Sequence, residues 1–247
     1  MQVRPVVGQL IYNILANLHL MNERILAVVL AAFLSIGAAF AMPPSERGDL
    51  LDENSATFLD VVSIRDAVIA MPKADLNQSE SEGILYMREE EKLARDAYWE
   101  FRDQYDLPVF DNIAGAEETH MDSVKVLMDK YELEDPILEA GKFADTDLQV
   151  LYDDLMAQGS SSVEEALRVG AVIEETDIQD LKDRLVETDN EDVKMVYESL
   201  MRGSRNHLRA FVNNLDRRGI DYTPQVLSQE GYDQIVGTPI ERGPYQS

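Results

Sequence analysis

Cysteine is absent from the 247 residues of this chain. Its absence excludes disulfides, thiolate metal sites, iron–sulfur clusters and a rubredoxin-like electron-transfer module. Basic residues are scarce, because 22 Lys and Arg stand against 47 Asp and Glu, and the formal charge is -25. That balance argues against nucleic-acid binding through phosphates. Any metal ion must therefore be held by oxygen and nitrogen atoms.

Long apolar runs are also lacking, apart from one segment near the N-terminus. From Met21 the sequence has a short polar start with Arg24, an apolar stretch from Ile25, and Ala39-Phe40-Ala41 as a small-x-small cleavage pattern. The stretch is shorter than the roughly 20 residues that span a bilayer comfortably. Residues 1–41 are therefore predicted to be a secretory signal. A retained anchor is the alternative, and Met21 is the candidate true start.

The signal segment predicts an exported protein, extracytoplasmic or secreted, cleaved after Ala41 and then without a permanent membrane span. Residues 42–79 are predicted to be a polar linker with one short helix. Beyond them the apolar residues follow a helical period, with no alternation of period two long enough for a strand. An all-α domain is therefore expected over 80–235, followed by a C-terminal tail over 236–247.

Four long helices are predicted within this domain. Their expected ranges are 81–105, 111–132, 163–187 and 189–218. Leu107-Pro108 should stop the first, Asp111 should cap the start of the second, and Gly219 should cap the end of the fourth. Tight turns join the first two and the last two, whereas 132–161 form a long connection with one short helix. This pattern predicts a ferritin-like four-helix bundle with one long crossover between helices 2 and 3.

Each predicted helix carries an inward-facing stripe at alternating spacings of three and four residues. The stripes are Ile84, Met87, Glu91, Ala94, Tyr98, Phe101 and Tyr105; Ile113, Glu117, His120, Val124, Leu127 and Tyr131; Val163, Leu167, Gly170, Glu174, Asp177 and Leu181; and Val193, Tyr197, Leu200, Ser204, His207 and Phe211. Polar residues interrupt all four stripes at similar depth. Burying several carboxylates there costs several kcal/mol each and adds mutual repulsion, which bound cations would offset.

The interruptions have the composition of a two-metal site. Four-helix bundles bind two ions with a Glu from each of two helices and a Glu-x-x-His pair from each of the others, because residues three apart share one helical face. Glu117 and His120 form one such pair. Taken singly, His120 and His207 are each more typical of a core or surface histidine. Together with acids at matched depth they favour a metal site.

The register of the first helix is ambiguous, since Glu90 can face inward almost as well as Glu91. One or two of Glu89, Glu90 and Glu91 are expected on a solvated face, where they would pair with Lys92 or Arg95.

Two family resemblances bear on this site. The spacing Glu91-x-x-Ala94-Arg95-x-x-Tyr98 resembles the first-helix motif of rubrerythrins, and its Glu, Ala and Tyr have the spacing seen in bacterioferritins. Four further segments, LYMREEEKLARDAYWEF, NIAGAEETHMDSVKVLMDKY, VGAVIEETDIQDL and GSRNHLRAF, closely resemble the uncharacterised ferritin-like family catalogued as domain of unknown function 2202. The resemblance implies a ferritin-like fold and a di-iron centre, and it selects Glu91 over Glu90. It does not imply a reaction.

The resemblance also implies a role for each matching position. Glu91 would be a first-helix ligand, Glu117 the bridging carboxylate and His120 a terminal ligand. Glu174 would be the third-helix carboxylate, and His207 the second imidazole.

One position departs from the ferritin pattern. Ser204 stands three residues before His207, where that pattern has the fourth-helix Glu. Asp177, one turn beyond Glu174 on the same face, would restore the total to four carboxylates and two imidazoles. Its alternative is a helix-surface aspartate. Such ligands suit two Fe ions, with Mn or Zn as alternatives.

The leading functional hypothesis is an exported ferritin-like di-iron protein, a non-haem oxidoreductase that oxidises iron or scavenges dioxygen or peroxide. Tyr98 is its catalytic candidate, because a buried tyrosine near a metal can hydrogen-bond a ligand or give up an electron; the alternative is core filling. A different hypothesis is a non-catalytic extracytoplasmic binding or stress-response module with a structural metal or none. The sequence leaves a homodimer open.

Overall fold

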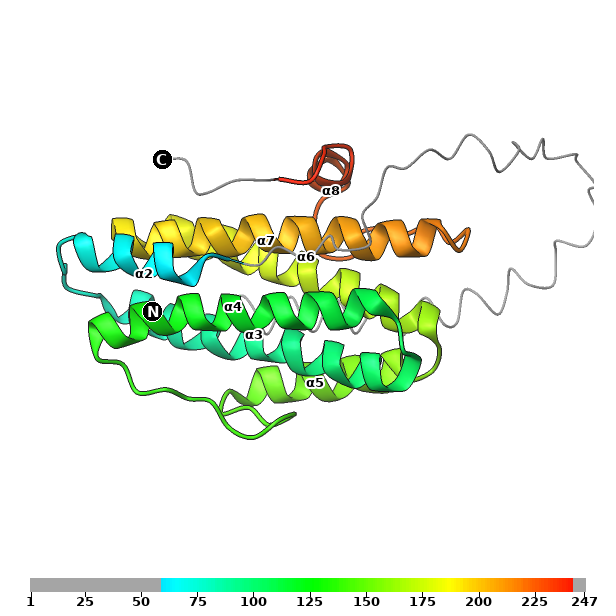
Figure 1. The fold of residues 1–247 in the computed structure, drawn as a ribbon, viewed down its shortest axis with the longest axis horizontal. Helices are drawn as coiled ribbons and strands as arrows, with labels where there is room; N and C mark the ends of the chain where they lie inside the picture. The colour runs from blue at the N-terminus through cyan, green and yellow to red at the C-terminus, as the bar shows by residue number, and fades with distance from the viewer. Residues whose placement is uncertain (1–58, 242–247) are drawn as a thin grey trace, which may run out of the picture. The chain divides into compact units, whose positions relative to one another are not determined.

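The computed structural model describes residues 59–241, which form seven helices and no strand (Figure 1). The predicted signal segment, residues 1–41, lies outside the described residues, as do 42–58 of the predicted linker and 242–247 of the tail. The helices are α2 (Val61–Ala70), α3 (Gln78–Tyr105), α4 (Pro108–Tyr131), α5 (Thr146–Gly159), α6 (Val163–Glu187), α7 (Glu191–Asp216) and α8 (Gln229–Val236). The prediction of an all-α helical bundle is confirmed.

The four long helices α3, α4, α6 and α7 form the bundle. The hairpins α3–α4 and α6–α7 lie side by side, with α3 packed against α6 and α4 against α7 (Figure 1). Both contacts between hairpins are antiparallel, since Gly83 near the start of α3 lies beside Arg184 near the end of α6. Likewise Lys130 at the end of α4 pairs with Asp192 at the start of α7. Helices α4 and α6 therefore run in the same direction, and their connection crosses the length of the bundle.

The helix ends follow local capping chemistry, with one departure from the expected caps. Helix α3 begins with a capping box between Asn77 and Glu80. Asp111 is not the N-cap of the second long helix, because α4 already begins at Pro108, whose missing N–H costs nothing in the first turn. Helix α7 ends at Asp216, and Gly219 follows with φ +72°.

The crossover is anchored to α3 by charged residues. The ammonium group of Lys92 is fully buried, pairs with Asp96 at 2.6 Å, and donates to the carbonyls of Glu139 and Lys142 at 3.0 Å each. Glu89 accepts hydrogen bonds from the first backbone amides before α5, those of Ala144 and Asp145. The outer face of α3 therefore fixes the connection that brings α6 back beside it.

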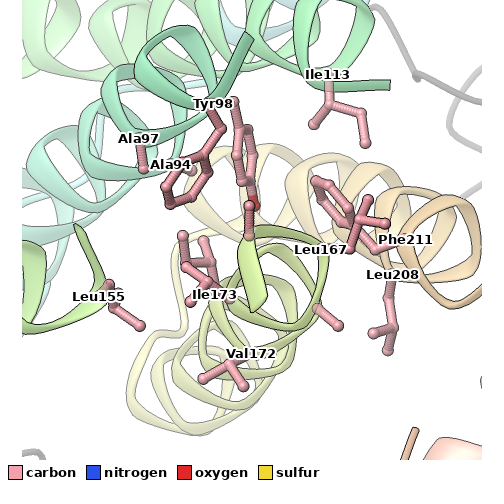
Figure 2. Packing of buried hydrophobic residues seen from close by; sticks show 14 of the residues in the cluster. Ala94, Ala97, Tyr98, Ile113, Leu155, Leu167, Val172, Ile173, Leu208 and Phe211 are labelled. Atoms are coloured by element: carbon pink, nitrogen blue, oxygen red, sulfur yellow. The ribbon is translucent and has the colours of Figure 1, made fainter. Parts of the chain in front are cut away.

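The core consists of two apolar clusters with a polar layer between them. One cluster includes Phe101, Phe110 and Phe211, and the other includes Met87 and Leu127. Figure 2 shows the first cluster, in which the Tyr98 and Phe211 rings approach to 5.1 Å between centroids. Along each long helix, the sequence passes from one cluster to the other through the polar interruptions of its stripe. The polar layer is therefore enclosed by apolar side chains on both sides.

The remaining helices cover the bundle. Helix α2 packs on α4 and α7, and α8, which the sequence did not predict, packs on α7. Glu175 fixes the segment before α8, because its carboxylate accepts from the Tyr222 hydroxyl and from the amides of Gln225, Val226 and Leu227. Within residues 59–241, no helix is long and apolar enough to cross a membrane.

Candidate metal centre

Six ionisable side chains from the four long helices meet in the polar layer. They are Glu91 of α3, Glu117 and His120 of α4, Glu174 and Asp177 of α6, and His207 of α7. Each is at most 5 % exposed. These are the six residues that the sequence nominated as metal ligands, and the structure brings them to one site.

Glu117 lies at the middle of this cluster, between the two imidazoles. Its Oε2 is 2.7 Å from Nδ1 of His120, and its Oε1 is 2.8 Å from Nδ1 of His207. The two rings stack, with centroids 5.2 Å apart and planes 17° apart. The i, i+3 spacing explains the contact with His120, because both side chains project from one face of α4. One carboxylate therefore joins two imidazoles from different helices.

Two further carboxylates flank this triplet, one beside each imidazole. Oε2 of Glu91 is 3.2 Å from Nδ1 of His120, and Oε2 of Glu174 is 3.5 Å from Nδ1 of His207. Each Nδ1 atom thus faces two carboxylates. The result is a pair of similar half-sites that share Glu117.

Asp177 lies beside Ser204, on the side of the cluster formed by α6 and α7. The Ser204 hydroxyl donates a short hydrogen bond to Oδ2 of Asp177 and lies 3.0 Å from the carbonyl of Leu200. Asp177 is buried, so the alternative of a helix-surface aspartate is wrong. Burial, and then the charge of Glu91 across the interface between α3 and α6, raise the pKa of Asp177 well above its usual range. The serine therefore leaves room for, and orients, a carboxylate from the neighbouring helix.

Tyr98 connects the cluster to the apolar core. Its hydroxyl donates to Oε1 of Glu174 at 2.6 Å, while its ring packs against Phe110 and Phe211. Both sequence interpretations therefore describe part of its environment, because the ring fills the core and the hydroxyl orients a candidate ligand.

Gly203 is a part of the site that the stripe analysis missed. A Cβ atom at this position would lie 2.4 Å from Cε1 and Nε2 of His120. Only glycine lets the α7 backbone approach the imidazole so closely. The sequence signal for this close approach is a glycine inside a predicted helix. It stands directly before Ser204 and four residues before His207.

Burial and mutual charge shift the pKa values of this cluster strongly. Burial raises the pKa of Glu91 to about 8, against the opposing influence of His120. Burial and the charge of Glu117 raise the pKa of Glu174 to about 7. Burial opposes ionisation of Glu117, but the His207 and His120 rings together hold its pKa well below its usual range. Of these three carboxylates, Glu117 is the one whose pKa is lowered.

The pKa values of both imidazoles are also raised, although burial opposes this change. Burial alone would lower the pKa of His207, yet Glu117 and Glu174 raise it to about 9. The pKa of His120 is raised well above its usual range, because Glu117 and Glu91 outweigh burial. A metal ion that bound these rings would therefore have to displace a proton from each of them.

Several buried polar atoms of the site could coordinate a cation. Oε1 of Glu91, Oδ1 of Asp177 and Nε2 of His120 are buried and have no hydrogen-bond partner among the described residues. Ligand atoms of Glu117, His120 and His207 lie within 4.8 Å of one another. Carboxylate oxygens with imidazole nitrogens are donors that suit Fe, Mn or Zn.

The expectation for the neighbouring acids of α3 was wrong. Glu89, Glu90 and Glu91 are all buried, so none of them lies on a solvated face. Lys92 pairs with Asp96 and supports the crossover. Tertiary contacts from α6 and from the crossover cover the positions that an isolated helix would leave in water.

Comparisons with known proteins agree with the helical architecture. The model of a family described as "Uncharacterized protein domain (DUF2202)" matches residues 80–239. The uncharacterized protein MJ0754 of Methanocaldococcus jannaschii is 47% identical over 178 residues, which cover 71% of this chain and 96% of that protein. The crystal structure of MJ0754 is similar to this fold with a TM-score of 0.68, covering 70% of this chain and 99% of that one.

Proposed function

The chain belongs to the DUF2202 family, and from its buried cluster of carboxylates and imidazoles we propose that it is a ferritin-like di-metal protein that binds two Fe ions. The convergence of Glu117, His120 and His207 on one buried point carries this proposal. Placing four carboxylates together in an apolar interior is costly, and the two imidazoles with the hydroxyls of Tyr98 and Ser204 offset only part of that cost.

Each half-site would hold one ion. His120 and Glu91 would supply ligands to the first ion, His207 and Glu174 to the second, and Glu117 would bridge the two. Asp177 would add the fourth carboxylate that Ser204 does not provide. The resulting set of four carboxylates and two imidazoles is the composition that four-helix bundles use for two-metal sites.

The surrounding residues would keep the site ordered and dry. Two apolar clusters enclose the polar layer. The Tyr98 hydroxyl orients Glu174, and the Ser204 hydroxyl orients Asp177. Bound iron would supply one-electron redox chemistry and coordination positions for dioxygen or peroxide. We therefore assign the protein to iron oxidation or to oxygen or peroxide scavenging, as a non-haem oxidoreductase.

Metal analysis with an oxidation assay tests this proposal. Anaerobic Fe(II) loading followed by desalting should leave two Fe ions per chain. Addition of hydrogen peroxide should then oxidise two Fe(II) for each peroxide reduced to water, and the product should show the absorption of an oxo-bridged diferric centre. A protein that retains no Fe(II), or retains it without oxidation by dioxygen or peroxide, would contradict the proposal.

A non-catalytic module is the second candidate. The contacts of Glu117 with both imidazoles favour it, because a carboxylate between two protonated rings satisfies part of the buried charge without any metal. One tightly held Zn ion per chain, with no response to Fe(II), would support this alternative.

We also propose that the protein is exported. The support is the sequence of residues 1–41, which has a polar start, an apolar stretch and the Ala39-Phe40-Ala41 pattern. N-terminal sequencing of the protein isolated from outside the cytoplasm should begin at Met42. A product that keeps the apolar stretch and sediments with membranes would indicate an anchor instead.

A further inference from the structure

Glu90 is a buried acid that the metal centre does not use. Its side chain is 4 % exposed, and neither of its carboxylate oxygens has a hydrogen-bond partner among the described residues. A buried carboxylate without any donor is costly, and native structures keep such groups only where something else compensates them.

The group that faces Glu90 is another buried acid. Asp180 of α6 is 6 % exposed, and its carboxyl group lies within hydrogen-bonding reach of that of Glu90. When both carboxyl groups are ionised, neither can donate a hydrogen bond, so two acceptor groups face each other. Tyr86 lies at the partly exposed edge of the bundle, and its hydroxyl donates a hydrogen bond of 3.2 Å to Oδ2 of Asp180. Asp180 therefore lies beside both Glu90 and Tyr86.

The nearest basic group does not neutralise this pair. The guanidinium of Arg184 stacks on the Tyr86 ring, with its central carbon 4.4 Å from the ring centroid. Nε of Arg184 has no hydrogen-bond partner among residues 59–241, and no carboxylate in that range lies within 4.0 Å of its nitrogens. The charge of Arg184 lowers the free-energy cost of burying two adjacent carboxylates, but Arg184 donates no hydrogen bond to their oxygens.

The acid pair is continuous with the metal centre. Glu90 directly precedes Glu91 on α3, and Asp180 lies one helical turn beyond Asp177 on α6. The residues proposed as metal ligands are almost fully buried, so ions need a path lined with oxygen atoms to reach them. Glu90 and Asp180 lie between that centre and the partly exposed Tyr86.

We propose that Glu90 and Asp180 form a second station for a divalent cation, with Tyr86 as its outer oxygen ligand, through which ions pass to the buried centre. The transit role rests on the metal centre proposed above, whereas the station itself does not. Because the station offers only oxygen atoms and no imidazole, it should hold first-row transition ions more weakly than the centre does. Weaker binding suits a site that must release its ion inward.

Diffraction from crystals of the full chain soaked in MnCl2 tests the station directly. The anomalous signal of Mn should give a peak between the Glu90 and Asp180 carboxylates, in addition to peaks beside Glu117. A filled centre without a peak at Glu90 would overturn the station and indicate that the two acids share a proton. Absence of peaks beside Glu117 would contradict the metal centre, while the peak at Glu90 would still decide the station.

Uptake kinetics test the transit role. The loss of the free Mn²⁺ electron paramagnetic resonance signal after mixing reports entry into the metal-free protein. Glu90→Gln and Asp180→Asn should each slow uptake at least tenfold, while the final Mn content of the centre stays as in the unaltered chain. Both substitutions keep the side-chain volume and remove a repelling charge, so folding, checked by circular dichroism, should survive.

Asp183→Asn is the matched control, because it removes the same charge from an exposed position of the same helix. Its uptake rate should equal that of the unaltered chain. Unchanged rates in Glu90→Gln and Asp180→Asn would overturn the transit role. Equal slowing in all three variants would assign the effect to overall charge and overturn it as well.

Discussion

Glu117 of α4 and His207 of α7, ninety positions apart in the chain, approach to 2.8 Å between Oε1 and Nδ1 in the interior of the bundle. Because the second oxygen of the same carboxylate reaches His120, Glu117 organises both imidazoles. Each ring also faces a further carboxylate. This relationship gives the site its two similar halves, and it is the reason for expecting two ions rather than one.

The close approach of Gly203 to His120 predicts the effect of one added methyl group. Gly203→Ala should displace the imidazole, because the new Cβ would lie 2.4 Å from two ring atoms. Displacement should reduce the retained metal from two ions to one or none, and overpacking should cost about 1 to 3 kcal/mol of stability. Metal analysis and urea unfolding measure the two effects.

Gly231→Ala in α8 is the control for this substitution, since its Cβ would meet only the Ser228 hydroxyl oxygen at 3.3 Å. It should keep both ions. Full metal content in Gly203→Ala would mean that the position of His120 does not determine binding.

The pKa shifts predict how the stability of the metal-free protein depends on pH. The pKa of His207 is raised to about 9 and that of Glu91 to about 8. At a pH between the unfolded pKa and the raised pKa of either group, the folded state therefore binds more protons than the unfolded state. The unfolded pKa is about 6.5 for His and about 4.3 for Glu. Stability should therefore fall as pH rises from 6.5 to 9.

Urea unfolding of the EDTA-treated protein at pH 6.5, 7.5 and 9 measures this dependence. Metal affinity should change in the opposite direction over the same range, because fewer protons have to be displaced at higher pH. A metal-free protein that becomes more stable between pH 6.5 and 9 would conflict with the assigned charges.

The hydrogen bond between Tyr98 and Glu174 predicts a stability difference that depends on the metal. Tyr98→Phe keeps the ring packing but removes the donor to Oε1 of Glu174. A buried acceptor that loses its partner costs about 1 to 3 kcal/mol. The metal-free variant should lose that amount, and the metal-loaded variant less, because the ion still compensates Glu174. Equal losses in both forms would argue against Glu174 as a ligand.

The ion pair of Lys92 with Asp96 predicts how strongly the crossover depends on a buried charge. Lys92→Met leaves Asp96 buried beside a neutral side chain and removes the donor to two crossover carbonyls. The expected loss is about 3 to 5 kcal/mol in urea unfolding. Lys125→Met breaks an exposed pair of the same spacing with Asp129 and should cost less than about 1 kcal/mol. Similar losses in the two variants would contradict this account.

The four long helices and the cluster of acids and imidazoles were predicted from the sequence for the same physical reason. The apolar period identifies the inward face of each helix, and an acid or imidazole on that face is conspicuous because it breaks the period. Glu117, His120 and His207 were found in this way. Asp177 was found from the missing acid at Ser204.

The features that escaped prediction depend on contacts between segments distant in the chain. The burial of Glu90 comes from α6, and that of Glu89 from the crossover. Neither contact is visible in the period of a single helix. The role of Gly203 required knowledge of where the His120 ring lies. The start of α4 before Asp111 reflects the tolerance of a first helical turn for proline, which sequence signals place only to within a few residues.

Metal content of Glu117→Ala, compared with Glu118→Ala, tests the central claim most directly. Both substitutions remove one glutamate from α4, but Glu117 lies between the imidazoles whereas Glu118 is exposed. After Fe(II) loading and desalting, Glu118→Ala should keep two ions per chain and Glu117→Ala should keep none. Two ions retained in Glu117→Ala would contradict the bridging role and, with it, the proposed metal centre.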